Sequence, residues 1–98
     1  MSLTQTIQAT AAADRIRWRY HALQRAQERG ISRDQAKRVI RKGDIVEQDS
    51  AARPFPKYLM MAEGAPHKPL YVALGYDPAD NYVYVITVHW LDPRTRAG

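Results

Sequence analysis

The main change in the spacing of apolar residues along this chain falls at Gly43, and this change constrains the fold more than any other feature. Before Gly43, apart from a short alternating run at residues 15–20, the apolar residues recur every three to four positions, as in an amphipathic helix. After it they alternate with polar residues in short runs, and turn-forming residues separate the runs. With 98 residues, the chain is long enough for one domain with a modest core. We therefore expect a single α+β domain over residues 1–98, with helices first and a sheet second.

The part of the chain before Gly43 predicts two to three helices. Residues 1–13 contribute a short, alanine-rich helix over residues 3–13, weakly amphipathic and frayed. A second helix covers residues 21–29 and ends at the glycine that follows. Ser32 and Gln35 have the spacing of a capping box, which predicts a third helix that ends at Gly43.

Strands account for the rest of the pattern. Residues 15–20 alternate arginine with Ile16, Trp18 and Tyr20, which predicts a half-buried strand, although a continuing helix also fits this segment. Four further strands are expected, over residues 44–48, 57–63, 70–76 and 82–90. Short connections make the last three an antiparallel meander. The prediction is two to three N-terminal helices packed on one face of a four- to five-stranded, mainly antiparallel sheet.

Basic residues gather in the helical half. From Asp14 to Lys42 there are ten basic and three acidic side chains, and from Gly43 to Gly98 five basic and seven acidic ones. A cationic half on a small domain predicts a polyanionic partner, nucleic acid before a membrane surface. The residues expected to contact nucleic acid are Arg15, Arg17, Arg19, Arg33, Lys37 and Arg41. The alternative for the last three is an ordinary hydrated helix face.

Several classes of site are not indicated. The chain has no cysteine, which excludes disulfides and thiolate metal sites and fits a cytoplasmic location. Its three histidines, at positions 21, 67 and 89, lack metal-ligand spacing, so no metal or other cofactor is expected. No segment approaches the roughly 20 apolar residues of a membrane span, and the opening residues do not resemble a signal peptide.

One candidate for chemistry is the second helix, where His21, Arg25 and Arg29 recur at every fourth position and share a face. Histidine exchanges protons near neutral pH, and arginine stabilises a charged phosphate. These groups suit metal-independent RNA cleavage, in which a base takes the proton of a ribose 2′-hydroxyl and an acid protonates the leaving 5′-oxygen. The structural alternatives are a packed or capping histidine and arginines neutralised by Glu28 or Asp14.

The last hairpin holds the second candidate. A turn around Ala79 would pair Tyr71 with Thr87 and make Tyr71 and His89 diagonal neighbours on one face. In this register the residues on the other face are Tyr82, Tyr84, Ile86 and Val88. A shift by two residues keeps Tyr71 and His89 on one face, and a shift by one separates them.

Five sequence blocks also occur in a characteristic order. They are His21-Ala22-x-x-Arg25-x-x-x-Arg29-Gly30-Ile31-Ser32, Gly43-Asp44-Ile45, Pro69-Leu70-Tyr71-Val72, Ile86-Thr87-Val88-His89 and Asp92-Pro93. Over residues 15–94 they resemble the bacterial domain-of-unknown-function family numbered 4258, and the first block is the most specific. This family is similar in predicted fold to RelE/ParE-type toxins and barnase-like ribonucleases. The resemblance implies a RelE-like fold and a toxin-like, metal-independent endoribonuclease scaffold in a small prokaryotic protein.

Carried over position by position, the resemblance implies a site of His21, Arg25, Arg29, Tyr71 and His89, with Thr87 beside it. The family usually has histidine where Tyr71 stands and tyrosine where His89 stands, so this chain has exchanged them. The exchange either preserves the chemistry of the site or marks its loss.

Three functions are therefore expected as alternatives. The first is an endoribonuclease acting on RNA. The second is a non-catalytic nucleic-acid-binding module that uses the basic helical face. The third is a regulatory module whose basic face docks an acidic protein partner such as an antitoxin, and it is compatible with either of the others.

Overall fold

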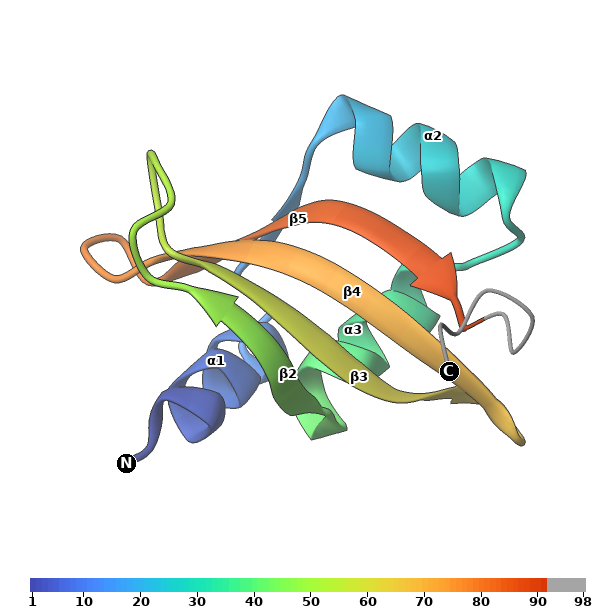
Figure 1. The fold of residues 1–98 in the computed structure, drawn as a ribbon, viewed down its shortest axis with the longest axis horizontal. Helices are drawn as coiled ribbons and strands as arrows, with labels where there is room; N and C mark the ends of the chain where they lie inside the picture. Colours follow the sequence, from blue (N-terminus) through green and yellow to red (C-terminus); the bar gives the residue numbers. More distant parts are fainter. Residues whose placement is uncertain (92–98) are drawn as a thin grey trace.

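Helices occupy the first half of the chain and strands most of the second, as the change of apolar spacing at Gly43 predicts. The protein is described by a computed structural model that covers residues 1–91 (Figure 1). Its elements are α1 (Leu3–Ala12), β1 (Ile16–Trp18), α2 (Tyr20–Glu28), α3 (Arg33–Lys42), β2 (Asp44–Asp49), β3 (Lys57–Ala65), β4 (Lys68–Asp77) and β5 (Tyr82–Trp90). The block Asp92-Pro93 lies outside the described residues.

The strands form one sheet in the order β1-β5-β4-β3-β2. Strand β1 runs parallel to β5, and the other neighbours are antiparallel. The predicted α+β class with a mainly antiparallel sheet is therefore confirmed. The first strand is shorter than predicted, because α2 already begins at Tyr20. The helical turn leaves the Tyr20 side chain 76% exposed, so the prediction that it shares the apolar face of Ile16 and Trp18 is wrong.

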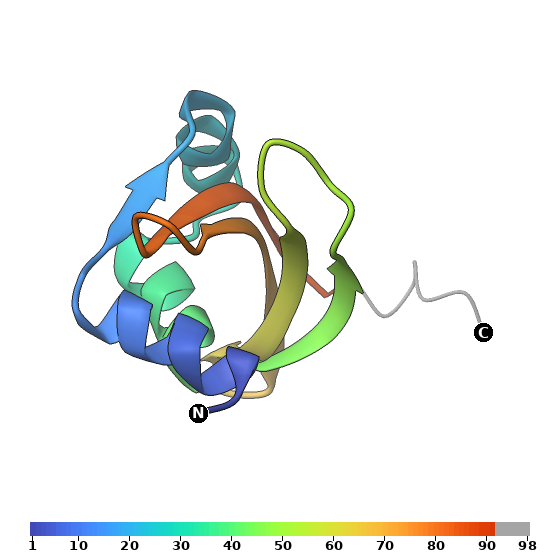
Figure 2. The ribbon, with the colours of Figure 1, turned by 90° about the vertical axis from the view of Figure 1, so that its left-hand side faces the viewer.

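Helices α1 and α3 pack together on one face of the sheet (Figure 2). Because Ser2 and Gln5 form a capping box at the start of α1, the helix is held at that end while Ile7 and Ala11 are fully buried. Helix α3 is strongly amphipathic and buries three residues toward the sheet, Ala36, Val39 and Ile40. The core is completed from the strands by Met60, Leu70, Val72, Leu74, Val83, Val85 and Val88.

The end of α3 approaches the backbone of β3 at Gly43. A Cβ atom at this position would collide with the carbonyl oxygens of Val39 and Met61, the second at 2.6 Å. Gly43 has an extended backbone, so the position requires glycine for close approach rather than for a left-handed conformation. Gly30 serves the other purpose, because its φ of +66° is left-handed and ends the segment that contains α2, as predicted.

Helix α2 lies along β5 rather than over the centre of the sheet (Figure 1). The backbone N–H of Arg19 donates to the Val85 carbonyl, and the Arg29 guanidinium donates to the Val88 carbonyl. In return, the indole N–H of Trp90 donates to the Arg29 carbonyl at 2.9 Å. Strand β1 pairs only with Val83–Val85 of β5, and α2 covers the rest of this edge. The N–H and C=O groups at that edge would otherwise have no neighbouring element.

Candidate functional site

The pairing of β4 with β5 places Tyr71 directly opposite His89. The sequence predicted a diagonal arrangement, and two local features account for the difference. The turn pairs Asp77 with Tyr82, so its centre lies between Ala79 and Asp80. Farther along, Leu74 pairs with Val85 but Ala73 pairs with Thr87, so a bulge leaves Ile86 of β5 without a partner. Each feature shifts the register by one residue. Because the shifts add to two, Tyr71 and His89 stay on one face.

The bulge also changes which residues share that face. Residues directly opposite in paired strands point to the same side. Tyr84 lies opposite Gly75, and Tyr82 lies opposite Asp77. The prediction that these two tyrosines point away from His89 is therefore wrong, because the extra residue at the bulge, Ile86, reverses the alternation. It is also wrong for Ile86, whose Cδ1 would lie 3.9 Å from a Cβ atom on Gly75, and it is confirmed for Val88, which is buried in the core. We call the face opposite α1 and α3 the open face; its residues on β4 and β5 are Tyr71, Ala73, Gly75, Asp77, Tyr82, Tyr84, Ile86, Thr87 and His89. The Asp77 carboxylate accepts from the backbone amides of the β4–β5 turn.

Tyr71 and His89 form a stacked pair on the open face. Their ring centroids are 5.1 Å apart, with an interplanar angle of 21°. Next to them, Nη1 of Arg29 donates to the carbonyl oxygen of Val88 at 2.6 Å. Burial lowers the pKa of His89 below its ordinary value of 6.5, and the positive charge of Arg29 lowers it further. His89 is therefore held in its neutral form at pH 7, beside a cation.

The other members of the predicted helical stripe lie farther along α2. Arg25 is one turn, about 6 Å, before Arg29, and His21 is about 12 Å before it. The Arg25 guanidinium forms an exposed ion pair with Glu28 at 3.3 Å, and the His21 ring meets Tyr20 edge-on. Among the predicted site residues, the structure thus brings together Arg29, Tyr71 and His89, with Thr87 on the same face, and leaves His21 apart.

Two of the predicted nucleic-acid contacts lie at the edge of the open face. The guanidinium groups of Arg15 and Arg17 lie 4.2 and 4.4 Å from the centre of the Tyr82 ring. Arg15 also donates to the carbonyls of Asp80 and Asn81, so it fastens β1 to the β4–β5 turn. Arg19 is exposed at the start of α2.

The basic residues of α3 lie on the other side of the molecule. Helix α3, which carries Arg33, Lys37 and Arg41, packs on the covered face of the sheet, whereas His89 lies on the open face. Lys37 forms an ion pair with Asp14 at 3.0 Å. The basic residues that follow one another in the sequence are thus divided between two surfaces.

Sequence reasoning missed the aromatic residues of the open face. Phe55, in the β2–β3 loop, stacks on Tyr84 at 5.2 Å with nearly parallel rings. Gly75 lies beneath them, since a Cβ atom there would be 3.8 Å from Phe55. The signal that could have revealed this pair is Gly75 itself, a glycine in the middle of an apolar strand, which often marks close approach of another group.

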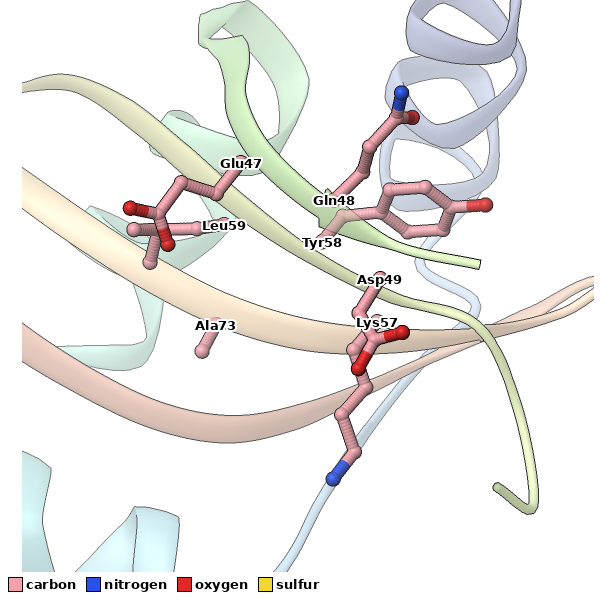
Figure 3. A pocket seen from close by; sticks show the side chains of 7 residues that line it. All are labelled: Glu47, Gln48, Asp49, Lys57, Tyr58, Leu59 and Ala73. Atoms are coloured by element: carbon pink, nitrogen blue, oxygen red, sulfur yellow. The ribbon is translucent and has the colours of Figure 1, made fainter. Parts of the chain in front are cut away.

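A shallow pocket of about 220 Å³ lies farther from β5, between β2 and β3 (Figure 3). Glu47 and Leu59 project to one side of these strands, whereas Gln48 and Tyr58 project to the other. Asp49 and Lys57 complete the pocket toward the loop. The carboxylates of Glu47 and Asp49 make this end of the sheet unfavourable for phosphate groups.

Within residues 1–91, no three His, Asp or Glu side chains gather in a group that could hold a metal ion. No helix in this part of the chain has the length and apolarity needed to cross a membrane.

One known protein family matches most of this chain. The model of the family described as Domain of unknown function (DUF4258) matches residues 18–90, which contain α2, α3 and the sheet from β2 to β5. The chain belongs to this family. The matched residues of this DUF4258 protein include Arg29, Tyr71 and His89. Neither the curated proteins nor the solved structures contain a significant match. The expected likeness to RelE/ParE-type toxins stays a prediction.

Tyr71 and His89 of this DUF4258 protein lie directly opposite each other, with stacked rings. The exchange of tyrosine and histidine stays a prediction. At positions so placed, such an exchange would keep one imidazole and one phenol within the same small volume and would put the imidazole on β5, the strand nearer Arg29.

Proposed function

We propose that the protein is a metal-independent endoribonuclease whose reaction centre is the group of His89, Tyr71 and Arg29. The stacked His89–Tyr71 pair beside the Arg29 guanidinium is the observation that carries this proposal. It combines a proton acceptor, a hydroxyl and a cation on an accessible face of the sheet. The three side chains come from β5, β4 and the end of the α2 segment, so the fold holds them together without a metal.

The proposed chemistry starts at His89, which takes the proton of a ribose 2′-hydroxyl. The 2′-oxygen then attacks the adjacent phosphorus, and the bond from phosphorus to the 5′-oxygen breaks. Tyr71 supplies the proton for the leaving 5′-oxygen. The products are a 2′,3′-cyclic phosphate on one fragment and a 5′-hydroxyl on the other.

Arg29 has two roles in this proposal. A guanidinium has five N–H donors. Within residues 1–91, the Arg29 guanidinium makes one hydrogen bond, to the Val88 carbonyl. The remaining donors are oriented by that bond and are suited to the negative charge that develops on the phosphorane. The same positive charge lowers the pKa of His89, which favours the neutral imidazole that a general base requires.

The test is incubation of the purified protein with a mixed-sequence RNA in EDTA, with analysis of the product ends. We expect cleavage that leaves 5′-hydroxyl ends. His89→Ala should slow it by about a hundredfold or more, the contribution typical of general acid–base catalysis. The matched control is His67→Asn, because His67 lies in the β3–β4 turn with a positive φ that asparagine tolerates. Products with 5′-phosphate ends would contradict the mechanism.

The second candidate is a non-catalytic RNA-binding module on the same surface. It is favoured by the bond from Arg29 to Val88, which gives that residue a structural role besides any catalytic one. It predicts RNA affinity that falls steeply with salt and yields no product. Absence of cleavage together with salt-sensitive binding would select it.

A further inference from the structure

We infer that the open face binds an unpaired RNA strand along β5, with its bases against the aromatic rings between Tyr82 and His89. This inference rests on the proposed function and names its substrate class, single-stranded rather than duplex RNA. It assigns a binding role to Phe55, Tyr82 and Tyr84, none of which belongs to the reaction centre.

A row of aromatic rings follows β5 on the open face. Tyr82, Tyr84 and His89 follow one another along β5 on the open face, and Tyr71 and Phe55 stack beside them. All five rings keep part of their surface in solvent. From Tyr82 to His89 the strand extends about 24 Å at the usual rise per residue, enough for several nucleotides. Aromatic rings at intervals along a strand form a platform on which successive bases stack.

Positive charge lies at the two ends of this row. Arg15 and Arg17 lie over Tyr82 at one end, and Arg29 lies beside His89 at the other. Within residues 1–91, the only ion pairs are those of Arg25 and Lys37, so no carboxylate is in direct contact with these three arginines. Cations along the row can therefore contact phosphates while the bases stack.

Negative charge lies at the β2 edge of the open face, away from β5. Glu47 lies opposite Leu59 and Asp49 opposite Lys57, so the carboxylates of β2 lie on the same face as the rings. They repel a phosphate backbone that runs toward β2. Because these two carboxylates outnumber the one cation beside them, Lys57, phosphates are favoured on the β5 side, where the reaction centre lies.

The bases of duplex RNA are stacked on one another and paired, so they cannot lie on protein rings. The open face offers ring surfaces as its main contacts, and these are useful only for bases that are free. A single strand is therefore favoured over a duplex.

The experiment measures fluorescence anisotropy of a labelled ten-nucleotide RNA in which every ribose is 2′-O-methylated. This probe cannot be cleaved through a 2′-hydroxyl, so the result does not depend on whether the protein is an enzyme. We expect the single strand to bind at least about tenfold more tightly than the same probe in a duplex, since ring stacking adds to affinity only when bases are free.

Variants identify the surface. Phe55→Leu should weaken single-strand binding by about fivefold or more, and Phe55→Trp should restore it, because stacking requires a ring and not merely an apolar side chain. Arg17→Ala should weaken binding and reduce the salt dependence by about one phosphate contact. The matched control is Arg41→Ala, an exposed arginine on the opposite side of the molecule.

Two outcomes would overturn the inference. Equal affinity for the duplex would show that ring surfaces do not receive bases. A larger effect of Arg41→Ala than of Arg17→Ala would place the nucleic acid on α3. Circular dichroism melting of each variant separates loss of binding from loss of folding. If the uncleavable probe binds as expected and natural RNA is not cleaved, the proposed catalysis fails while the binding surface stands.

Discussion

Helices α2 and α3 have similar lengths and each presents arginines, yet the fold uses them differently. Helix α3 buries Ala36, Val39 and Ile40 against the sheet and ends at the close contact of Gly43 with β3. Helix α2 buries only two alanines and lies along one strand. The cations of α3 face solvent on the covered side, whereas Arg29 reaches the strand beside His89.

The environment of a basic stripe, and not its sequence pattern, therefore decides what the stripe contacts. The helical period determines which side chains share a face of their own helix. It does not determine whether that face meets solvent, the core or the edge of a strand. In this protein the helix with less buried apolar surface is the one that reaches the candidate site.

The largest expected effect tests the close packing of α3. Gly43→Ala should lower the free energy of unfolding by about 3 kcal/mol, because the new methyl group meets two backbone carbonyls that cannot move freely. The control is Gly30→Ala after α2, which meets open space and should cost about 1 kcal/mol for its left-handed backbone. Urea denaturation at pH 7 measures both, and equal losses would contradict the contrast between the helices.

The next effect tests the attachment of α2. Arg29→Ala removes the bond to the Val88 carbonyl and should lower the free energy of unfolding by about 1.5 kcal/mol, the low end for a hydrogen bond from a charged group. Arg25→Ala should change it by less than about 0.5 kcal/mol, since its ion pair with Glu28 is exposed. The same denaturation experiment compares them. A loss for Arg25→Ala that matches the loss for Arg29→Ala would mean that the whole stripe, and not Arg29, holds the helix.

A smaller effect concerns how the two helices begin. Ser32 accepts a hydrogen bond from the Gln35 backbone at 3.0 Å, and Ser32→Ala should cost about 1 kcal/mol. Helix α2 has no side-chain cap, because its first flanking residue is Arg19. Arg19→Ser should therefore stabilise the protein, by about 0.5 kcal/mol. Thermal unfolding followed by circular dichroism checks the two signs, and a loss in both variants would show that Arg19 contributes by another contact.

The smallest effect follows from the pKa of His89. The pKa is lowered in the folded protein by burial and by Arg29, whereas in the unfolded chain it is about 6.5. As the pH falls below 6.5, the unfolded chain binds a proton before the folded protein does, so stability decreases until the folded pKa is reached. We expect His89→Gln to lose less stability than the natural chain between pH 7.5 and 5.5 in urea denaturation. An identical pH dependence in His89→Gln and the natural chain would contradict the shift.

Local features of the fold were predictable. The capping box of Ser32 and Gln35, the left-handed Gly30 and the change of period at Gly43 each depend on residues close in the sequence. The paired rings of Tyr71 and His89 were also predicted to share a face, although the register that brings them together was not. That register depends on a turn centred between Ala79 and Asp80, rather than on Ala79, and on the bulge next to Leu74. Both are set by pairing across strands.

The order of helices and strands, the α+β class and the candidate residues of the proposed site could all be predicted from the sequence, because each follows from local periodicity and residue type. Three features depend on the packing of the elements: Arg29 bonds to the strand next to His89, Tyr82 and Tyr84 share the face of His89, and the cations of α3 lie elsewhere. A sequence pattern defines only which side chains share a face of their own helix or strand. Which of these faces lie next to each other depends on the bulge in β5 and on the packing of α2 along the edge of that strand.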